Sequence, residues 1–367
     1  MKLPNIEKPT LLLDPTRVQK NIRRMAEKAR QQGIRFRPHF KTHQSDQIGE
    51  WFREQGVSAI TVSSVDMALY FADCGWTDIT IAFPVNWRQL EKLWVLARTV
   101  QLGLLVESVD SAAWLEQNLN VPVSLWVEVD EGSGRSGIPW EDTSTLLQLV
   151  GKIQQSSHHQ FKGLLTHAGR IYTSDSVEEI KSIYAQTVQR MIQARDFLRS
   201  KGVEVCEVSI GNTPGCSLVS DLGEVDEIRP GNFVFYDAQQ LRLGSCQAED
   251  ISVVLACPVV AKYPARGEVI IYGGAIHLSK DTVMEQGQPV YGLVASQVEE
   301  GWGSPVPGGY VARLSQEHGV LHLPEPFLSQ VAIGDVVMII PAHSCLSVSA
   351  LSEYHTLDGE IIPAFHG

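Results

Sequence analysis

One lysine lies between two histidines in a segment that could supply a reactive amine. Residues 37–43 read Arg-Pro-His-Phe-Lys-Thr-His and close a run in which Ile34 and Phe36 alternate with arginines, a pattern typical of a half-buried strand. A lysine just past a strand end lies where barrel and open-sheet enzymes carry their chemistry. Lys41 is therefore a candidate catalytic amine, although a solvated charge at a strand end would give the same pattern.

A histidine and a cysteine near the C-terminus, His343 and Cys345, form a second candidate site. On an extended strand this spacing places both side chains on one face. Imidazole and thiolate together prefer zinc. Two protein ligands leave positions for water or substrate, as a catalytic metal requires. A chance His-x-Cys pair on a buried strand is the alternative interpretation.

Two further segments could bind anionic groups. Gly211, Asn212 and Thr213 end a predicted strand, where glycine allows close backbone approach and small polar groups suit a phosphate. Arg135 lies in a loop with three glycines in six residues, and its guanidinium suits a planar anion. An ordinary turn and a surface arginine are the alternatives.

The elements that must position these residues alternate between strand and helix. A helix beginning at Asp14-Pro15 is followed by eight predicted strands, which fit a closed (β/α)8 barrel in number and length. An open doubly wound sheet ranks second. The predicted strands are Ile34–Phe40, Ala59–Val62, Asp78–Phe83, Gln101–Val106, Val121–Val129, Phe161–Thr166, Glu204–Ile210 and Val225–Arg229.

Beyond about Tyr236 the helical periodicity nearly vanishes. Short β-rich runs separated by glycine and proline predict a second, all-β domain. We expect a barrel over residues 10–240 and a β-domain over residues 241–367 together with about residues 1–9. The runs that support it are Ile251–Cys257, Glu268–Tyr272, Gly309–Leu314 and Val336–Ile340.

Composition limits the class of protein. The chain has 367 residues, of which 44% are hydrophobic, and a net charge of -12. An acidic balance argues against nucleic acid and against anionic membrane as partners. No apolar run approaches the roughly 18 residues of a membrane span. Six scattered cysteines without a Cys-x-x-Cys pair indicate a reducing compartment, so we expect a cytoplasmic protein.

These motifs together resemble the D-threonine aldolase and D-serine dehydratase family, whose fold is shared with alanine racemase. The likeness runs from about Pro9 to Gly359 and rests on six motifs in the family's order. It implies an alanine racemase-type barrel followed by the β-domain, to which Lys8–Leu13 is expected to cross over. It also implies that Lys41 holds pyridoxal phosphate (PLP) as a Schiff base.

The resemblance assigns the phosphate of PLP to two loops. Gly211, Asn212 and Thr213 match the family's phosphate loop, with Asn212 standing where serine is usual. The segment 227–237 matches a second signature, in which the backbone N–H groups of Gly231 and Asn232 bind phosphate.

The resemblance also places arginines on the cofactor. Arg229 aligns with the arginine near the pyridine nitrogen, although an ion pair with Glu227 or Asp226 would explain it equally. Arg135 aligns with an arginine that reaches the phenolic oxygen of PLP or the substrate carboxylate.

His167 and Tyr172 match family positions that line the PLP pocket and act in catalysis. The chain departs from the family at two neighbouring positions. Relatives often carry tyrosine where Leu165 stands and histidine where Arg170 stands, which leaves the orientation of the substrate and the proton relay open.

The family places its metal at the positions of His343 and Cys345. The cysteine favours zinc over manganese or magnesium and favours elimination chemistry. His277 and Asp281 are weaker candidates for groups around the metal.

The resemblance implies a PLP- and metal-dependent lyase of D-β-hydroxy-α-amino acids, active as a homodimer on a small D-amino-acid substrate. Retro-aldol cleavage would give glycine and an aldehyde, and elimination would give a keto acid and ammonia. The sequence leaves this choice open. An amino-acid racemase, a non-catalytic PLP-binding protein and a phosphosugar enzyme on a plain barrel are the alternatives.

Overall fold

The structure is a computed structural model that describes residues 5–299 and 301–366. It contains two compact units. The first comprises the described residues up to Arg23, Thr42–Trp51 and Asn232–His366, and the second comprises Arg24–Lys41 and Phe52–Gly231. The chain passes from one unit to the other within helices α1 (Pro15–Gln31) and α2 (Asp46–Arg53), so neither unit is a continuous segment.

The second unit is built on a ring of eight parallel strands. Neighbouring strands pair in parallel throughout, and a parallel bridge between His39 and Thr61 joins the two ends of the series. The predicted (β/α)8 barrel is therefore confirmed. In order around the ring the strands are β2 (Arg35–Phe36), β10 (Glu227–Ile228), β9 (Glu207–Gly211), β8 (Gln160–His167), β6 (Ser124–Asp130), β5 (Gln101–Val106), β4 (Asp78–Pro84) and β3 (Ile60–Val62).

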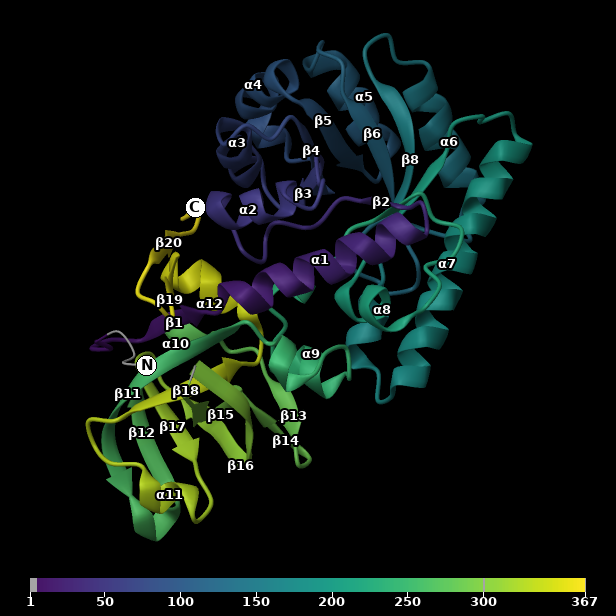
Figure 1. Ribbon diagram of the computed structural model, residues 1–367. Helices are drawn as coiled ribbons and strands as arrows, with labels where there is room; N and C mark the ends of the chain where they lie inside the picture. The colour runs from purple at the N-terminus through teal and green to yellow at the C-terminus, as the bar shows by residue number, and fades with distance from the viewer. Residues whose placement is uncertain (1–4, 300, 367) are drawn as a thin grey trace. The chain divides into compact units, whose positions relative to one another are not determined.

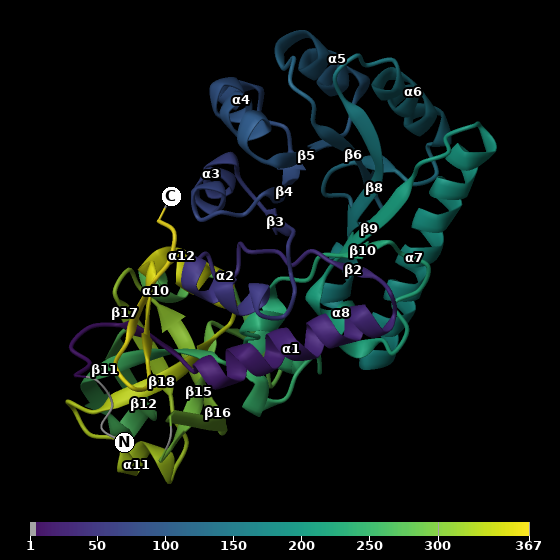
Figure 2. The ribbon, with the colours of Figure 1, turned by 45° about the horizontal axis from the view of Figure 1, so that its top comes forward.

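Helices connect these strands and lie outside the ring, as Figure 2 shows. Most begin at a serine, aspartate or asparagine whose side chain accepts a backbone N–H of the first turn, for example Ser64 and Ser176. Asp142 likewise caps the helix that begins at Thr143. The helices are α3 (Val65–Asp73), α4 (Leu90–Thr99), α5 (Val109–Asn118), α6 (Thr143–Gln154), α7 (Val177–Ser200) and α8 (Thr213–Leu218).

A buried ion-pair network joins the strand starts of this barrel. Glu227 is fully buried on β10, and its carboxylate accepts hydrogen bonds from Arg35 Nε at 2.6 Å and Arg37 Nε at 2.7 Å. Arg37 also reaches Asp78, at the start of β4, at 2.7 Å. Burial raises the pKa of Glu227, but Arg37 and Arg35 outweigh that effect and lower it to about 2.

The first unit contains a mainly antiparallel sheet, six strands of which close on themselves because β12 pairs with both β17 and β11. Figure 1 shows helix α11 (Phe327–Gln330) at one end of this sheet. In order the strands are β12 (Glu268–Tyr272), β17 (His318–His322), β16 (Gly301–Leu314), β15 (Gly292–Val298), β18 (Val336–Pro341), β11 (Val253–Tyr263), β1 (Thr10–Leu13), β19 (Glu353–Thr356) and β20 (Ile361–Pro363); β13 (Val283–Glu285) and β14 (Gln288–Val290) form a separate hairpin.

The expected crossing of the N-terminal segment is confirmed for Thr10–Leu13. This strand pairs antiparallel with β11 and parallel with β19, so it is part of the first unit although the predicted domain boundary at residue 10 assigns it to the barrel.

The region after Tyr236 contains short helices that the sequence pattern does not predict. They are α9 (Ala238–Arg242), α10 (Ala275–Leu278), α11 (Phe327–Gln330) and α12 (Ser344–Leu351). Within the described residues, no helix has both the length and the apolar character that crossing a bilayer requires.

Candidate active site

A cavity of about 360 Å³ lies at the carboxyl ends of the barrel strands. Its walls include Lys41 and His39 after β2, His167 at the end of β8, and Arg229 after β10. Arg135, from the loop after β6, also faces it. Five residues from four distant segments of the sequence, four of them among the predicted site residues, therefore meet in one cavity, because parallel strands end at the same face of a barrel.

Arg229 is fixed in the wall of this cavity. Its Nε donates to Ser209 Oγ at 2.7 Å, and its Nη2 donates to the carbonyl oxygen of Thr166 at 2.6 Å. Burial lowers the pKa of this guanidinium to about 10. A Cβ atom on Gly211 would lie 3.0 Å from Nη1 of Arg229, so glycine at that position allows the arginine to approach the loop.

The two histidines of the cavity are neutral at neutral pH. Desolvation, followed by the charges of Lys41, Arg135 and Arg229, lowers the pKa of His167 to about 3. Desolvation and Lys41 also lower the pKa of His39 well below its usual value. A neutral imidazole offers one donor and one acceptor, so these rings can hydrogen-bond or stack without adding positive charge.

The predicted phosphate loop is the N-terminus of helix α8. Asn212 is its cap, and its Oδ1 accepts the backbone N–H of Gly215 at 2.6 Å. The buried Nδ2 of Asn212 has no hydrogen-bond partner among the described residues. The N–H of Thr213 faces Tyr172 OH at 3.4 Å, and the Tyr172 ring stacks on His167 with centroids 5.8 Å apart. Tyr172 therefore lies beside the phosphate loop rather than in the cavity wall.

The second predicted phosphate segment is divided between the units. Gly231 ends the second unit and Asn232 begins the last part of the first. The side chain of Asn232 is buried and donates to Asp237 at 2.7 Å. That contact gives its side chain a role in addition to the backbone role that the resemblance assigns.

Strand β6, before the Arg135 loop, carries a carboxylate that the sequence motifs did not single out. Glu128 is buried, and its Oε1 accepts Ser136 Oγ at 2.8 Å and lies 3.7 Å from Arg135 Nη2. The sequence could have indicated this residue, because Glu128 is a glutamate inside the otherwise apolar run of β6.

The two departures from the family pattern have separate roles. Leu165 packs with Leu105 and Trp126 in an apolar cluster, and Leu165 and Leu105 also line the cavity. Arg170 Nε lies 3.2 Å from Glu131, which is fully buried, and thereby ties the loop after β8 to the loop after β6.

The predicted metal ligands begin a helix, so their placement on an extended strand is wrong. Strand β18 ends at Pro341, His343 is the cap residue, and Cys345 is the second residue of α12. The cause is a distant acceptor: the backbone N–H of Ser344 donates to the Asp237 carboxylate at 3.0 Å.

His343 and Cys345 remain neighbours in this arrangement. Burial lowers the pKa of His343, but the hydrogen-bonded Cys345, then Asp237 and Asp281, outweigh it and raise the pKa to about 9. Cys345 Sγ is buried and lies 3.2 Å from the hydroxyl of Thr42, the residue after Lys41.

Among the described residues, no group of three or more metal-binding side chains is present. His277 instead accepts the backbone N–H of Gly274 within its own short helix.

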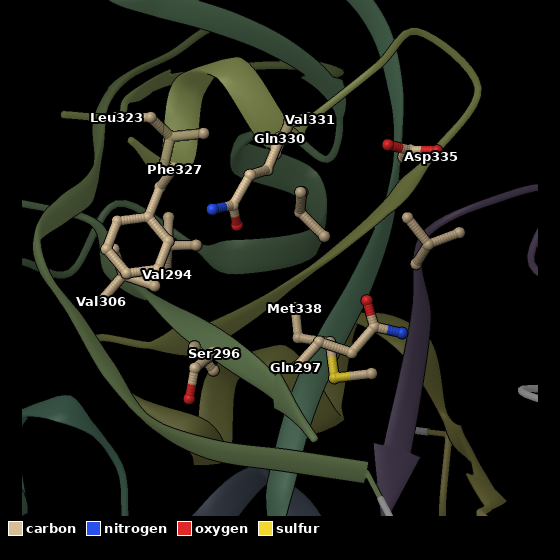
Figure 3. A pocket seen from close by; sticks show the side chains of 13 residues that line it. Val294, Ser296, Gln297, Val306, Leu323, Phe327, Gln330, Val331, Asp335 and Met338 are labelled. Carbon is tan, nitrogen blue, oxygen red and sulfur yellow. The ribbon is translucent and has the colours of Figure 1, made fainter. Parts of the chain in front are cut away.

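A second cavity, of about 550 Å³, lies in the first unit (Figure 3). Phe327, Val294 and Val306 form an apolar wall, and the amide of Gln330 points inward. The described residues that line it include no lysine, arginine or histidine, so it lacks the groups that the first cavity brings together.

Two family domains cover most of the chain. The alanine racemase N-terminal domain matches residues 13–239, and the putative serine dehydratase domain matches residues 252–357.

Proteins of known activity resemble the chain over nearly its whole length. The D-threo-3-hydroxyaspartate dehydratase of Delftia sp. (strain HT23) is 30% identical over 370 residues, which cover 98% of this chain and 97% of that protein. Its structure has a TM-score of 0.90 and covers 99% of this chain and 98% of that chain. The D-serine dehydratase of Dictyostelium discoideum is 29% identical, covering 98% and 96%. The D-threonine aldolase of Arthrobacter sp. is 26% identical, covering 93% and 86%.

Two solved variants of D-threo-3-hydroxyaspartate dehydratase replace a histidine and a cysteine, two positions apart, by alanine. The cysteine variant is in the metal-free form. These similarities span both domains in the same order. The chain therefore belongs to the family in which an alanine racemase N-terminal domain precedes a serine dehydratase domain, as in the D-amino-acid dehydratases and the aldolase named above.

Proposed function

We propose that this protein is a PLP- and divalent-metal-dependent lyase that dehydrates D-β-hydroxy-α-amino acids to a keto acid and ammonia. The observation that carries the proposal is the meeting of Lys41, His167, Arg135 and Arg229 in one cavity at the barrel's catalytic face. Similarity over the whole chain to enzymes named dehydratases supports the reaction type.

The residues around Lys41 fit PLP. The cavity is of ligand size, and it presents an amine and two arginines to a cofactor that carries a phosphate and a phenolic oxygen. The buried Nδ2 of Asn212 is a donor with no partner among the described residues, at the loop where the phosphate is expected. Gly211 leaves space that a side chain would fill.

His343 and Cys345 fit a zinc ion better than manganese or magnesium, because imidazole and thiolate are soft ligands. The metal-free cysteine variant of D-threo-3-hydroxyaspartate dehydratase has its substitution two residues after a histidine, which is the spacing found here. With two protein ligands, further positions stay open, and a metal so bound acts as a Lewis acid on an oxygen ligand.

We expect each residue of the cavity to have a separate role in binding or catalysis. Bound PLP supplies an electron sink for a carbanion at Cα. Lys41 Nζ would hold the cofactor and then accept the Cα proton of the substrate. The β-hydroxyl would leave as hydroxide, so that the elimination removes one water in total. Arg135 binds the substrate carboxylate, and its planar fork fixes the orientation. Arg229 would supply a cation to the ring nitrogen, while neutral His167 would hydrogen-bond or stack without adding charge.

Retro-aldol cleavage is the second candidate, because the aldolase of Arthrobacter sp. shares most of the chain. A racemase is less favoured, since the sequence lacks the Ser-Tyr-Gly segment that carries the second base in alanine racemase. A non-catalytic PLP-binding protein that consists of a barrel alone would not account for the second domain, which matches residues 252–357.

The first test concerns Lys41. Purified protein should show the visible absorption of a PLP Schiff base, and borohydride should fix the cofactor covalently. Lys41→Ala should abolish both signals, whereas Lys181→Ala, at an exposed helix position, should change neither. Covalent fixation in Lys41→Ala would refute the assignment.

The second test concerns the reaction. D-Serine, D-threonine and D-threo-3-hydroxyaspartate are incubated separately with the protein, and keto acid and glycine are measured. Keto acid with ammonia supports dehydration, glycine with an aldehyde supports the aldolase candidate, and product from none of the three would contradict both.

We also propose a homodimer, as the fold family implies. Light scattering should then give about twice the 40.5 kDa mass of the chain. A mass of one chain would contradict it.

A further inference from the structure

Asp237 is a fully buried carboxylate that directly precedes helix α9. Its Oδ1 accepts the backbone N–H of Gln240 at 3.0 Å and so caps helix α9. Its Oδ2 accepts Asn232 Nδ2 at 2.7 Å and the N–H of Ser344 at 3.0 Å. All of these residues belong to the first unit.

The contact with Ser344 fixes where α12 begins. His343, the cap residue, makes no side-chain capping bond, so the helix depends on another acceptor for its first N–H groups. Asp237 supplies that acceptor from 107 positions away. Cys345 is the next residue, so this bond holds the backbone immediately before it.

The same oxygen also faces the other candidate ligand. His343 Nδ1 lies 3.9 Å from Asp237 Oδ2, which is longer than a hydrogen bond but close enough for an electrostatic contact when the imidazole is protonated. A histidine that binds metal through one ring nitrogen usually presents the other to a carboxylate, which fixes the ring and strengthens the ligand.

Capping α9 needs only Oδ1, whereas Oδ2 faces His343 and accepts the N–H of Ser344, the residue before Cys345. Asn232 reinforces this arrangement, because its Nδ2 also donates to Ser344 Oγ at 2.9 Å and lies 3.7 Å from Cys345 Sγ. Resting on the metal site of the proposed function, we infer that Asp237 is a positioning residue that orients His343 and Cys345 for zinc.

The test measures zinc affinity directly. Metal-stripped wild type and Asp237→Asn are titrated with zinc against a colorimetric chelator, and unfolding of the metal-free proteins is followed in parallel. We expect Asp237→Asn to weaken zinc binding about 10- to 100-fold. Asp250→Asn is the matched control: Asp250 is buried in the same unit and accepts the N–H of Gln247 at 3.1 Å, so its loss should leave zinc affinity unchanged.

A second pair of variants decides the matter if Asp237→Asn does not fold. Ser344→Pro removes the N–H that Asp237 accepts, and proline is tolerated at the first position of a helix. The extended backbone of His343 (φ -137°, ψ 110°) is compatible with a following proline. Ser344→Ala keeps the N–H. Zinc binding should weaken in Ser344→Pro and be nearly unchanged in Ser344→Ala.

Wild-type zinc affinity in a folded Asp237→Asn or in Ser344→Pro would overturn the positioning role while leaving the metal site intact. If wild type binds zinc no better than a protein lacking both His343 and Cys345, the metal site of the proposed function fails, and the positioning role fails with it.

Discussion

At the scale of single residues, burial rather than sequence neighbourhood sets the charge of the histidines around Lys41. His43 is fully buried, and its Nδ1 lies 3.2 Å from the backbone N–H of Ser45. Burial lowers its pKa to about 3. His167 in the cavity shows the same direction of shift. An unfolded chain would bind a proton at each position near pH 6.5, and the folded protein would not.

This difference predicts acid sensitivity. Between about pH 6.5 and pH 3 the unfolded state binds more protons than the folded state, so stability is complete above pH 6.5 and falls as pH decreases. His43→Asn should remove up to about 1.4 kcal/mol per pH unit from that slope. Urea unfolding at several pH values between about 5 and 7 measures it. The exposed His318, changed to asparagine, serves as the control, and an unchanged slope in His43→Asn would contradict the argument.

At the scale of elements, the barrel depends on charges that join strands distant in sequence. Glu227 on β10 binds arginines on and just after β2, and these two strands, the last and the first of the barrel in chain order, pair in parallel. Arg37 is itself buried and continues to Asp78 on β4. The carboxylate is therefore compensated in the folded state, and its removal would leave a buried guanidinium with too few partners.

Glu227→Gln should destabilise the protein by about 3–5 kcal/mol, because breaking a buried ion pair leaves the other charge uncompensated. Urea unfolding gives the free energy. Glu224→Gln breaks a pair with Arg195 in which the glutamate is 78% exposed, and its cost should stay below about 1 kcal/mol. Equal effects of the two variants would show that burial does not determine the cost.

At the scale of the whole molecule, Lys41 and Arg229, which are proposed to bind PLP, and the two residues proposed to bind the metal belong to different compact units. Lys41 and Arg229 lie in the unit built on the parallel barrel, and His343 and Cys345 lie in the unit built on the antiparallel sheet. Lys41 and Arg229 can therefore keep their arrangement when the metal is removed.

A chelator should thus lower lyase activity at least about tenfold, while the Schiff-base absorption persists. Adding zinc back should restore the activity. Absorption spectra and product assays on the same sample measure both effects. Full activity in a sample shown to be free of metal would contradict the metal dependence, and loss of the absorption band would contradict the independence of the two sites.

The sequence by itself determined the alternation of strands and helices, and each of the eight predicted barrel strands overlaps an observed one. It also determined which residues follow a strand. Since parallel strands end at one face of a barrel, the meeting of Lys41, His167 and Arg229 followed from the topology. These features depend on local periodicity and on short connections, which the sequence displays directly.

Only the tertiary structure decided how the second candidate site is built. Val336–Ile340 indicated a strand, and local pattern gave no reason for a helix to begin at Ser344. The acceptor that starts this helix is Asp237, whose neighbours in sequence suggest nothing beyond a cap for its own short helix. A hydrogen bond across 107 positions has no local signature, because it depends on which segments pack together rather than on the propensity of either one.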